Sequence, residues 1–303
     1  MKKVLYSLLL FVMIFMSSCS FSNNNLEEEV SIITPKGIPF LAIGGLLEEE
    51  NVKIESVAGA ENLQTALVTG SHDIVIAPIN LGAKLYSANK SNYKVAAVIT
   101  ANNSYIVTKE ENPLDSVYDL VGEKVIAFGS TGVPGNILKT VYERNDLLNV
   151  EDIDFSFSSS ADVYSVFAGN STNAKYALMS EPEITKLQLK DNISVKKIDL
   201  CDVLGVYTPQ ACIFVNPNSD KETIDIVLKM IENNMIYLNE NPQEYSNEVV
   251  KLDKSFELMG KEIISTSIPN ANIEYKNALD SRLEIENILT IIGVTLPTEE
   301  FDY

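Results

Sequence analysis

Tryptophan is absent from this chain of 303 residues, and histidine occurs only once. Arginine occurs at Arg144 and Arg282, both in segments with helical periodicity, so a bidentate arginine clamp on a carboxylate or sulfonate is not evident. With one histidine and no Cys-x-x-Cys spacing, the sequence holds nothing from which a zinc or redox centre could be built. We therefore expect neither a metal nor a cofactor.

Positive charge is also scarce. Lysine and arginine together number 23 against 42 aspartates and glutamates, which gives a formal net charge of −19 at pH 7. Such a surface repels nucleic acid phosphates and anionic lipid headgroups, so we expect no nucleic acid partner. The hydrophobic content of 46% predicts a folded globular protein, and the length favours two domains.

Cysteine occurs three times, at Cys19, Cys201 and Cys212. Cys212 lies in the apolar, strand-like run from Ala211 to Val215, which favours burial. We interpret Cys201 and Cys212 as two buried free thiols, although a bridge between them outside the cytoplasm stays open.

The N-terminus has the pattern of an export signal. Lys2 and Lys3 precede the apolar run from Val4 to Met16, and small residues then precede Cys19. The run of about 13 residues is shorter than the roughly 20 that a membrane-spanning helix needs. We therefore expect residues 1–18 to be a signal peptide.

Residues 16–19 resemble a bacterial lipobox, with Met16 in place of the more usual leucine. The resemblance implies that Cys19 becomes the lipidated first residue of the mature protein; the alternative is a plain secreted form. Residues 19–29 are polar and are expected to form a flexible tether. The expected location is the outer face of the cytoplasmic membrane or the periplasm, with a lipid anchor.

From Val30 onward, strand-like and helix-like segments alternate. The expected strands are residues 31–34, 52–57 and 73–77, and the expected helices are residues 38–50 and 62–69. This alternation predicts βαβ units with parallel strands. Three loops, at residues 35–39, 58–61 and 78–81, follow the carboxyl ends of these strands. Open α/β sheets bind ligands at that edge.

A central stretch, residues 123–138, has the pattern of strand, loop and helix. Val125 to Phe128 is a short apolar run, Gly129 and Gly132 allow a tight turn, and Pro134 suits the first turn of a helix. The loop hydroxyls would therefore lie at a helix N-terminus, where main-chain N–H groups lack partners. This geometry suits a loop that binds a ligand. The alternative is an ordinary connecting loop, with Thr131 as the helix cap.

A second α/β cycle begins near Leu114. Further strands are expected at residues 154–158 and 175–179, and a helix at residues 161–168. Two strand-like runs, residues 104–109 and 207–215, are expected to be the two chain crossings between lobes. The C-terminal part is helical, and Ser219 with Glu222 is expected to form a capping box.

The order of these motifs resembles that of ABC-transporter substrate-binding proteins. The matching motifs are the lipobox, Gly37-Ile-Pro39 before a helix, Gly70 followed by Asp73-Ile-Val-Ile-Ala77, Asp119-Leu-Val-Gly-Glu-Lys-Val125, and Ser180-Glu-Pro182. The resemblance covers residues 30 to 292 and is greatest to the nitrate, sulfonate and taurine class and its thiamine-precursor-binding relatives.

This resemblance implies a type 2 periplasmic-binding-protein fold, with two α/β lobes joined by a two-strand hinge. Lobe I would comprise residues 30–105 and 208–303, and lobe II residues 106–207. One side of the ligand cleft would be lined by Gly37, Ile38, Pro39, Gly59, Pro78, Ile79 and Asn80. The other side would be lined by Ser130, Thr131, Gly132, Val133 and Glu181.

The function implied is that of a lipoprotein, expected to be monomeric, that captures a small molecule and delivers it to an ABC permease. Lys36 is the one cation in a ligand loop, which departs from what a strict sulfonate binder would show. The ligand is expected to be a neutral or weakly charged heterocycle held by Asn80, Tyr164 and Glu181, or a small oxyanion held by helix N-termini and hydroxyls. The alternative roles are core packing for Tyr164 and helix capping for Glu181.

Two other classes of function stay open. One is an enzyme on the same fold that acts on a pyrimidine-type or chorismate-derived metabolite, which the export signal and the lack of a catalytic cluster disfavour. The other is a lipoprotein that presents its ligand to a membrane sensor, which the sequence does not separate from a transport receptor.

Overall fold

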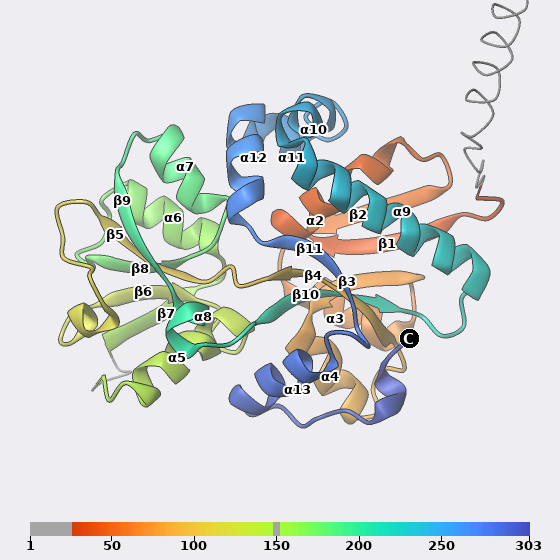
Figure 1. Ribbon diagram of the computed structural model, residues 1–303, viewed down its shortest axis with the longest axis horizontal. Helices are drawn as coiled ribbons and strands as arrows, with labels where there is room; N and C mark the ends of the chain where they lie inside the picture. Colours follow the sequence, from red (N-terminus) through yellow and green to blue (C-terminus); the bar gives the residue numbers. More distant parts are fainter. Residues whose placement is uncertain (1–25, 148–151) are drawn as a thin grey trace, which may run out of the picture.

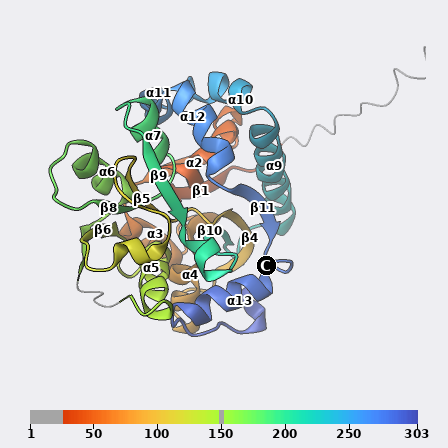
Figure 2. The same cartoon turned by 60° about the vertical axis from the view of Figure 1, so that its left-hand side comes forward.

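The computed structural model describes residues 26–147 and 152–303. The expected signal peptide and Cys19 lie outside the described residues. The described chain forms two β-sheets side by side, each with helices on both faces (Figure 1). Figure 2 brings the second sheet forward, with its edge strand β9 nearest the viewer.

The first sheet has the spatial order β11, β4, β10, β3, β1, β2. Its strands are β1 (Val30–Pro35), β2 (Val52–Val57), β3 (Ile74–Pro78), β4 (Lys94–Ala101), β10 (Pro209–Val215) and β11 (Ile273–Asn277). β1 pairs in parallel with β2 and β3, whereas β10 runs antiparallel between β3 and β4. The three strands predicted in the first cycle are confirmed as β1, β2 and β3; β4 and β11 are not among the predicted strands.

The second sheet has the spatial order β7, β6, β8, β5, β9. Its strands are β5 (Tyr105–Lys109), β6 (Val125–Phe128), β7 (Ile153–Phe157), β8 (Tyr176–Met179) and β9 (Val195–Asp199). β6 pairs in parallel with β7 and β8, and β5 pairs antiparallel with β8 and β9. The predicted strands at residues 125–128, 154–158 and 175–179 are confirmed, and β9 was not predicted.

Alternate residues of the strands face opposite layers of helices. On the first sheet, Val75 and Ala77 pack against α3 (Ala60–Thr69), α4 (Ile79–Ser87) and α13 (Arg282–Ile291). Ile74 and Ile76 pack in the other layer, whose helices are α2 (Ile38–Ala42), α9 (Lys221–Glu240), α10 (Pro242–Val249), α11 (Lys254–Met259) and α12 (Lys261–Ser267). Short 3₁₀ helices complete the chain at η1 (Gly44–Glu48), η2 (Val117–Leu120), η4 (Ile268–Asn270) and η5 (Glu299–Phe301).

The second sheet is covered in the same way. Its helices are α5 (Val133–Arg144) and α8 (Leu200–Leu204) in one layer, and α6 (Ser160–Ala168) and α7 (Glu183–Leu189) in the other. The apolar cluster under α5 is continuous with the cluster under α3 and α4 of the first sheet. The two halves of the molecule therefore share one apolar layer.

The chain passes between the sheets twice, at residues 102–104 and 205–208. These crossings are shorter than the predicted ones, because β5 lies wholly in the second sheet and β10 wholly in the first. The side chain of Asn102 accepts a hydrogen bond from the Thr208 amide at 2.7 Å. Asn272 donates to the Asn102 carbonyl at 2.8 Å. The two crossings are thus tied to each other and to the start of β11.

The helix predicted at residues 38–50 is in fact α2 followed by η1. At the break, Asn234 of α9 donates to the Ala42 carbonyl at 2.6 Å, and the Leu46 amide, which a continued α-helix would direct to that carbonyl, donates to Ile43 instead. A Cβ atom on Gly45 would lie 2.2 Å from Asn234 Oδ1, so a larger residue there would require the Asn234 side chain to move. The prediction of one continuous helix was wrong.

The predicted capping box at α9 is also wrong. Asp220 is the N-cap residue, and its carboxylate accepts from the Thr223 amide at 2.8 Å. The Ser219 hydroxyl instead donates to Asp73 at 2.6 Å, and the same carboxylate accepts from the Ser31 hydroxyl at 2.6 Å. Ser219 therefore joins β1, β3 and the start of α9.

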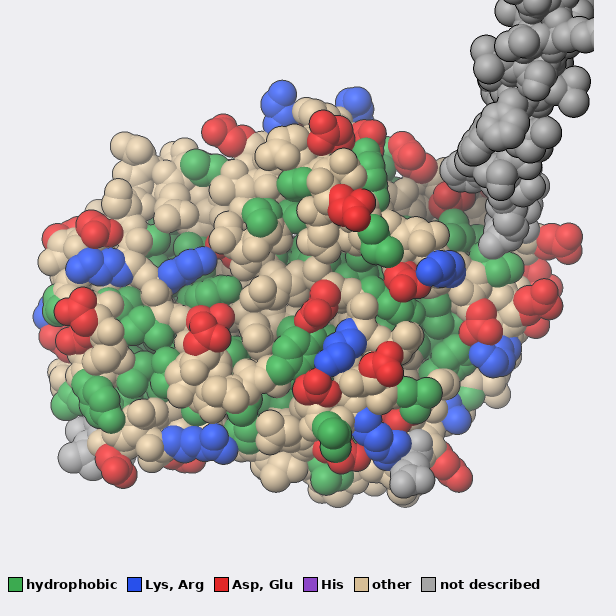
Figure 3. Space-filling model, in the orientation of Figure 1, with side chains coloured by type: hydrophobic (Ala, Val, Ile, Leu, Met, Phe, Trp, Pro, Cys, Tyr) green, Lys and Arg blue, Asp and Glu red, His purple; other side chains and the backbone are tan. Residues whose placement is uncertain are grey.

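Cys201 and Cys212 are buried free thiols, as predicted. Burial raises the pKa of the Cys201 thiol to about 12, so it stays protonated at neutral pH. Within residues 26–147 and 152–303, no helix is long and apolar enough to cross a bilayer. On the face drawn in Figure 3, lysines and arginines lie among acidic side chains.

Candidate functional site

Parallel strands place their carboxyl ends at one edge of each sheet. In the first sheet, β1, β2 and β3 lead into Lys36 to Pro39, Gly59 and Pro78 to Asn80. In the second sheet, β6 and β8 lead into Ser130 to Val133 and Glu181. Apart from Tyr164 on α6, every predicted ligand residue therefore follows the carboxyl end of a strand, as expected for ligand positions in open α/β sheets.

The loop between β6 and α5, Gly129–Gly132, has a tight turn built by its glycines. Gly129 has a φ of +67°, in the left-handed region that favours glycine, and its carbonyl accepts from the Gly132 amide at 2.8 Å. A Cβ atom on Gly135 would lie 2.2 Å from the same Gly129 carbonyl. Gly129 and Gly135 thus allow the turn to lie against the start of α5.

The structure shows which glycine of this loop has an unusual backbone angle, and that the alternative interpretation of Thr131 as the helix cap is wrong. Gly132 has an ordinary extended backbone, with φ −86° and ψ 176°, so the unusual backbone angle belongs to Gly129 instead. Gly132 is the N-cap residue of α5, and within the described chain no side chain caps this helix. Thr131 is therefore not the cap; its side chain is exposed.

A cation lies at this loop that the sequence analysis does not identify. Lys139, on the second turn of α5, donates to the Ser130 carbonyl at 2.6 Å. Its ammonium lies 5.0 Å from the centre of the Phe155 ring of β7. The lysine holds the loop against the helix and supplies positive charge near the helix N-terminus.

The strand-end loops of the two sheets are in direct contact. Asn80 Nδ2, on the first turn of α4, donates to the Thr131 carbonyl at 3.0 Å. Asn80 is only 7% exposed, and its Oδ1 is buried with no hydrogen-bond partner among the described residues. Asn80 and Thr131 are thus two predicted ligand residues, from different sheets, that the structure brings together.

The remaining predicted ligand residues differ in how exposed they are, and so in which of their atoms could contact a ligand. Ile38, Ile79 and Val133 have buried side chains, so mainly their main chains can face a ligand. Lys36 and Gly59 are exposed, and Gly37, Pro39, Pro78, Ser130 and Gly132 are partly exposed. As ligand contacts, all of these stay predictions.

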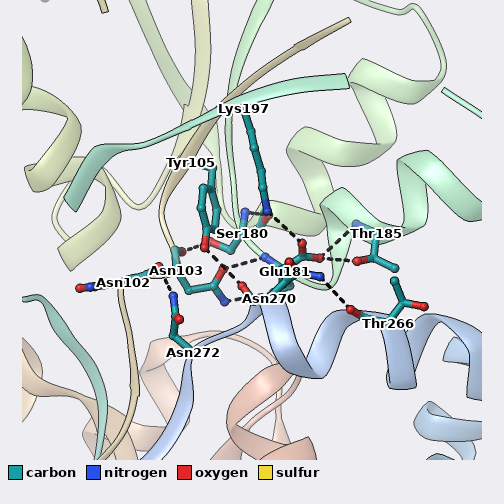
Figure 4. Close-up of polar contacts among 11 residues, drawn as sticks. Asn102, Asn103, Tyr105, Ser180, Glu181, Thr185, Lys197, Thr266, Asn270 and Asn272 are labelled. Atoms are coloured by element: carbon teal, nitrogen blue, oxygen red, sulfur yellow. Dashed lines mark hydrogen bonds and ion pairs between the residues drawn. The ribbon is translucent and has the colours of Figure 1, made fainter. Parts of the chain in front are cut away.

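Glu181 lies in a polar cluster beside the first crossing (Figure 4). Its Oε2 accepts from the amide and the hydroxyl of Thr185, at 3.0 and 2.8 Å, and its Oε1 lies 3.8 Å from the Lys197 ammonium. Its main-chain N–H donates to the Asn103 side chain at 2.8 Å. The carboxylate therefore caps the first turn of α7, which was the alternative interpretation from sequence.

The same cluster joins the second sheet to the C-terminal helices. Tyr105, at the start of β5, donates to the Asn270 carbonyl at 3.3 Å, and Lys197 lies 4.4 Å from the centre of its ring. Asn103 and Lys197 are functional candidates that sequence reasoning missed. Asn103 lies within a crossing and Lys197 within the unpredicted strand β9, so neither had a motif.

Tyr164 packs on the side of α6 that faces α7. It adjoins the apolar cluster under these helices, and the Lys186 ammonium lies 6.0 Å from its ring centre. Burial raises its pKa to about 12, and a hydrogen bond to Asp191 adds to the effect. These contacts fit the alternative interpretation of core packing, and its ligand role stays a prediction.

Glu181 gives a pH-dependent prediction. Burial raises its pKa above the ordinary 4.5, against the opposing hydrogen bonds from Thr185 and the charge of Lys197. The folded protein then binds this proton more tightly than the unfolded chain does, so ionisation costs stability as pH rises above 4.5. The free energy of unfolding of the wild type, compared with that of Glu181→Gln, should be most favourable below pH 4.5 and should decrease relative to the variant as the pH rises above it. Urea unfolding of both proteins between pH 3.5 and 7 measures this difference; a wild-type advantage that grows with pH would contradict it.

The chemistry available at this edge is recognition by hydrogen bonds, helix N-termini and a few lysines. The described residues contain no group of three or more histidine, cysteine or carboxylate side chains placed to hold a metal ion. Arg144 lies in the last turn of α5, and Arg282 on α13 pairs with Glu286 and Asp302. Both arginines therefore lie on helices away from the strand-end loops, as predicted.

Two mixed α/β sheets, joined by two crossings and meeting at their strand-end loops, define the periplasmic-binding-protein fold. Comparison with solved structures supports this assignment. A protein described as an ABC transporter from Parabacteroides distasonis has a TM-score of 0.74 at 18% identity, covering 91% of this chain and 99% of its own.

Two further neighbours have the same fold. The periplasmic aliphatic sulphonate-binding protein SsuA from Escherichia coli has a TM-score of 0.70 at 15% identity, covering 91% of this chain and 92% of its own. The ligand-binding component of an ABC-type import system from Staphylococcus aureus has a TM-score of 0.69 at 12% identity, covering 91% and 96%. No protein family model matches the chain, and no curated protein matches it in sequence. The chain thus has the fold of ABC-transporter substrate-binding proteins.

Proposed function

We propose that this protein is an extracytoplasmic solute-binding protein that captures a small molecule between its two sheets and delivers it to an ABC importer. The observation that carries the proposal is the contact between Asn80 and the Thr131 carbonyl, which joins the ligand edges of the two sheets. The fold shared with two proteins described as parts of ABC transporters, and with a periplasmic sulphonate-binding protein, supports the same function.

Capture would work by closure of two lobes, one around each sheet: residues 30–105 with 208–303 and residues 106–207, except that Tyr105 belongs with the second lobe because it begins β5. Contacts between a ligand and the second lobe exist only in the closed state, so the ligand stabilises that state by those contacts. The two crossings are the natural hinge. A permease would recognise the closed form, and no nucleophile, base or metal is required.

The proposed ligand residues are those that follow the strands. From lobe I they are Lys36, Gly37, Ile38, Pro39, Gly59, Pro78, Ile79 and Asn80. From lobe II they are Ser130, Thr131, Gly132, Val133 and Glu181, with Tyr164 as a more distant contributor. We further propose that the mature protein is a monomer held at the outer face of the membrane by a lipid on Cys19, which raises its concentration near the permease.

Native mass spectrometry of the protein, purified from its producing cells without denaturation, tests this function. We expect the protein to carry an additional small mass, which disappears after unfolding in urea and refolding. Conversion of the released compound by the protein would instead indicate an enzyme on the same fold. A purified protein that carries no small molecule, and that binds none from an extract of the same cells, would contradict the proposal.

A further inference from the structure

The orientation of the Asn80 amide is fixed by its neighbour. The Thr131 carbonyl oxygen can only accept a hydrogen bond, so the Asn80 atom 3.0 Å from it must be the donor Nδ2. The other amide atom, Oδ1, can only accept. One of the two N–H groups of Nδ2 is thus occupied by the Thr131 carbonyl, while the acceptor Oδ1 has no partner among the described residues.

The surroundings of Oδ1 exclude water. Asn80 is 7% exposed, and the Oδ1 atom is buried with no donor among the described residues. Its chain neighbour Ile79, at 0% exposure, and Val133 across the loops, at 1%, belong to one apolar cluster. A buried acceptor without a donor is costly, because it has lost its hydrogen bonds to water.

This cost depends on the closed arrangement. The partner of Nδ2 lies on the loop of the other sheet, so separation of the two loops would return the Asn80 amide to water. Closure without a suitable ligand leaves Oδ1 unsatisfied, whereas closure on a ligand that donates to it does not. The amide thus makes closure sensitive to the hydrogen-bonding character of the ligand.

We infer, on the basis of the proposed function, that Asn80 Oδ1 selects ligands that present an N–H or a neutral O–H group. Acceptor-only oxyanions, such as sulfonates, carboxylates and nitrate, would place a negatively charged oxygen beside Oδ1. With such a site, this protein would bind a different class of ligand from the aliphatic sulphonate-binding protein whose fold it shares.

Matched pairs of probes test this inference. Nicotinamide with nicotinate, benzamide with benzoate, and methanesulfonamide with methanesulfonate differ little in size, but only the amide of each pair donates N–H groups. Binding to the full mature protein, stripped of co-purified compounds by refolding, is measured by calorimetry. We expect amides to bind roughly ten-fold to hundred-fold more tightly than their anionic partners.

Asn80→Leu is the decisive variant, because leucine is of similar size and has no acceptor. It should weaken amide binding by about ten-fold to hundred-fold and should not weaken anion binding, since the repulsion from Oδ1 is removed, so the amide preference is expected to disappear. Asn80→Ala replaces it if the leucine variant does not fold, as judged by its melting temperature. An amide preference that persists in the variant would arise from the net negative charge of the protein and would overturn the inference.

Equal binding of both members of a pair, tighter binding of the anion, or binding of no probe at all would also overturn the inference. None of these outcomes contradicts the proposed function. That function is decided separately, by whether the unstripped protein carries a small molecule in its native mass spectrum.

Discussion

Replacement of Gly135 by alanine is expected to destabilise the protein by about 3 kcal/mol, the upper range for overpacking of a closely packed site. The new Cβ would lie 2.2 Å from the Gly129 carbonyl oxygen and 2.7 Å from its carbon. These are main-chain atoms that already hold the turn through the Gly132 amide, so the loop must move as a whole. The gain in helix propensity from glycine to alanine, about 1 kcal/mol, is too small to offset the clash.

Gly132→Ala is the matched control in the same loop. A Cβ there would lie 3.5 Å from the Gly129 carbonyl oxygen, which is ordinary contact, and the backbone is extended. Its free energy of unfolding should fall by no more than about 1 kcal/mol, the cost of replacing an N-cap glycine by alanine. Urea denaturation of both variants provides the measurement. Similar stability for the two variants would show that the turn does not pack against α5 as described.

Cys19→Ala is expected to move the protein from the membrane fraction to the soluble fraction. The prediction rests on the lipobox-like pattern of residues 16–19, because a lipid on this cysteine is the proposed attachment. The first strand, β1, begins at Val30, so the substituted position lies outside the strands of both sheets. Detergent phase partition and the mass of the N-terminal peptide measure the outcome.

Cys201→Ala is the control for this experiment, because it removes a buried thiol and leaves the proposed anchor in place. That variant should remain in the membrane fraction. If the Cys19 variant, with its signal peptide removed, also stays with the membrane after a salt wash, the protein is held there by something other than a lipid on Cys19.

The parallel strands were predictable because each is a short apolar run bounded by glycine, proline or polar residues. β3 shows this well: its residues alternate between two apolar layers, so the whole strand is hydrophobic. The break between α2 and η1 was not predictable, because the side chain that binds the Ala42 carbonyl there, Asn234, lies 192 residues away along the chain. Local patterns predict elements, and distant side chains decide where they end.

The edge of the sheets that holds the candidate site was predictable once the strands were known, because parallel strands place their carboxyl ends at one edge. The pairing of Asn80 with Thr131 was not, because it joins loops 51 residues apart through a single amide. Nor could the sequence show which glycine of the central loop is constrained. That depends on Gly135 meeting the Gly129 carbonyl, a contact that exists only once the helix has formed.

The place of β10 in the first sheet has a consequence for the order in which the protein folds. β10 lies between β3 and β4, yet in sequence it follows every strand of the second sheet, which is built from one continuous segment, Tyr105–Asp199. Until residues 209–215 arrive, β3 and β4 each have an unpaired edge. As a hypothesis, the second sheet should gain hydrogen-exchange protection first during refolding; earlier protection of β4 would contradict it. A chain exported from its N-terminus would then complete its second sheet before its first.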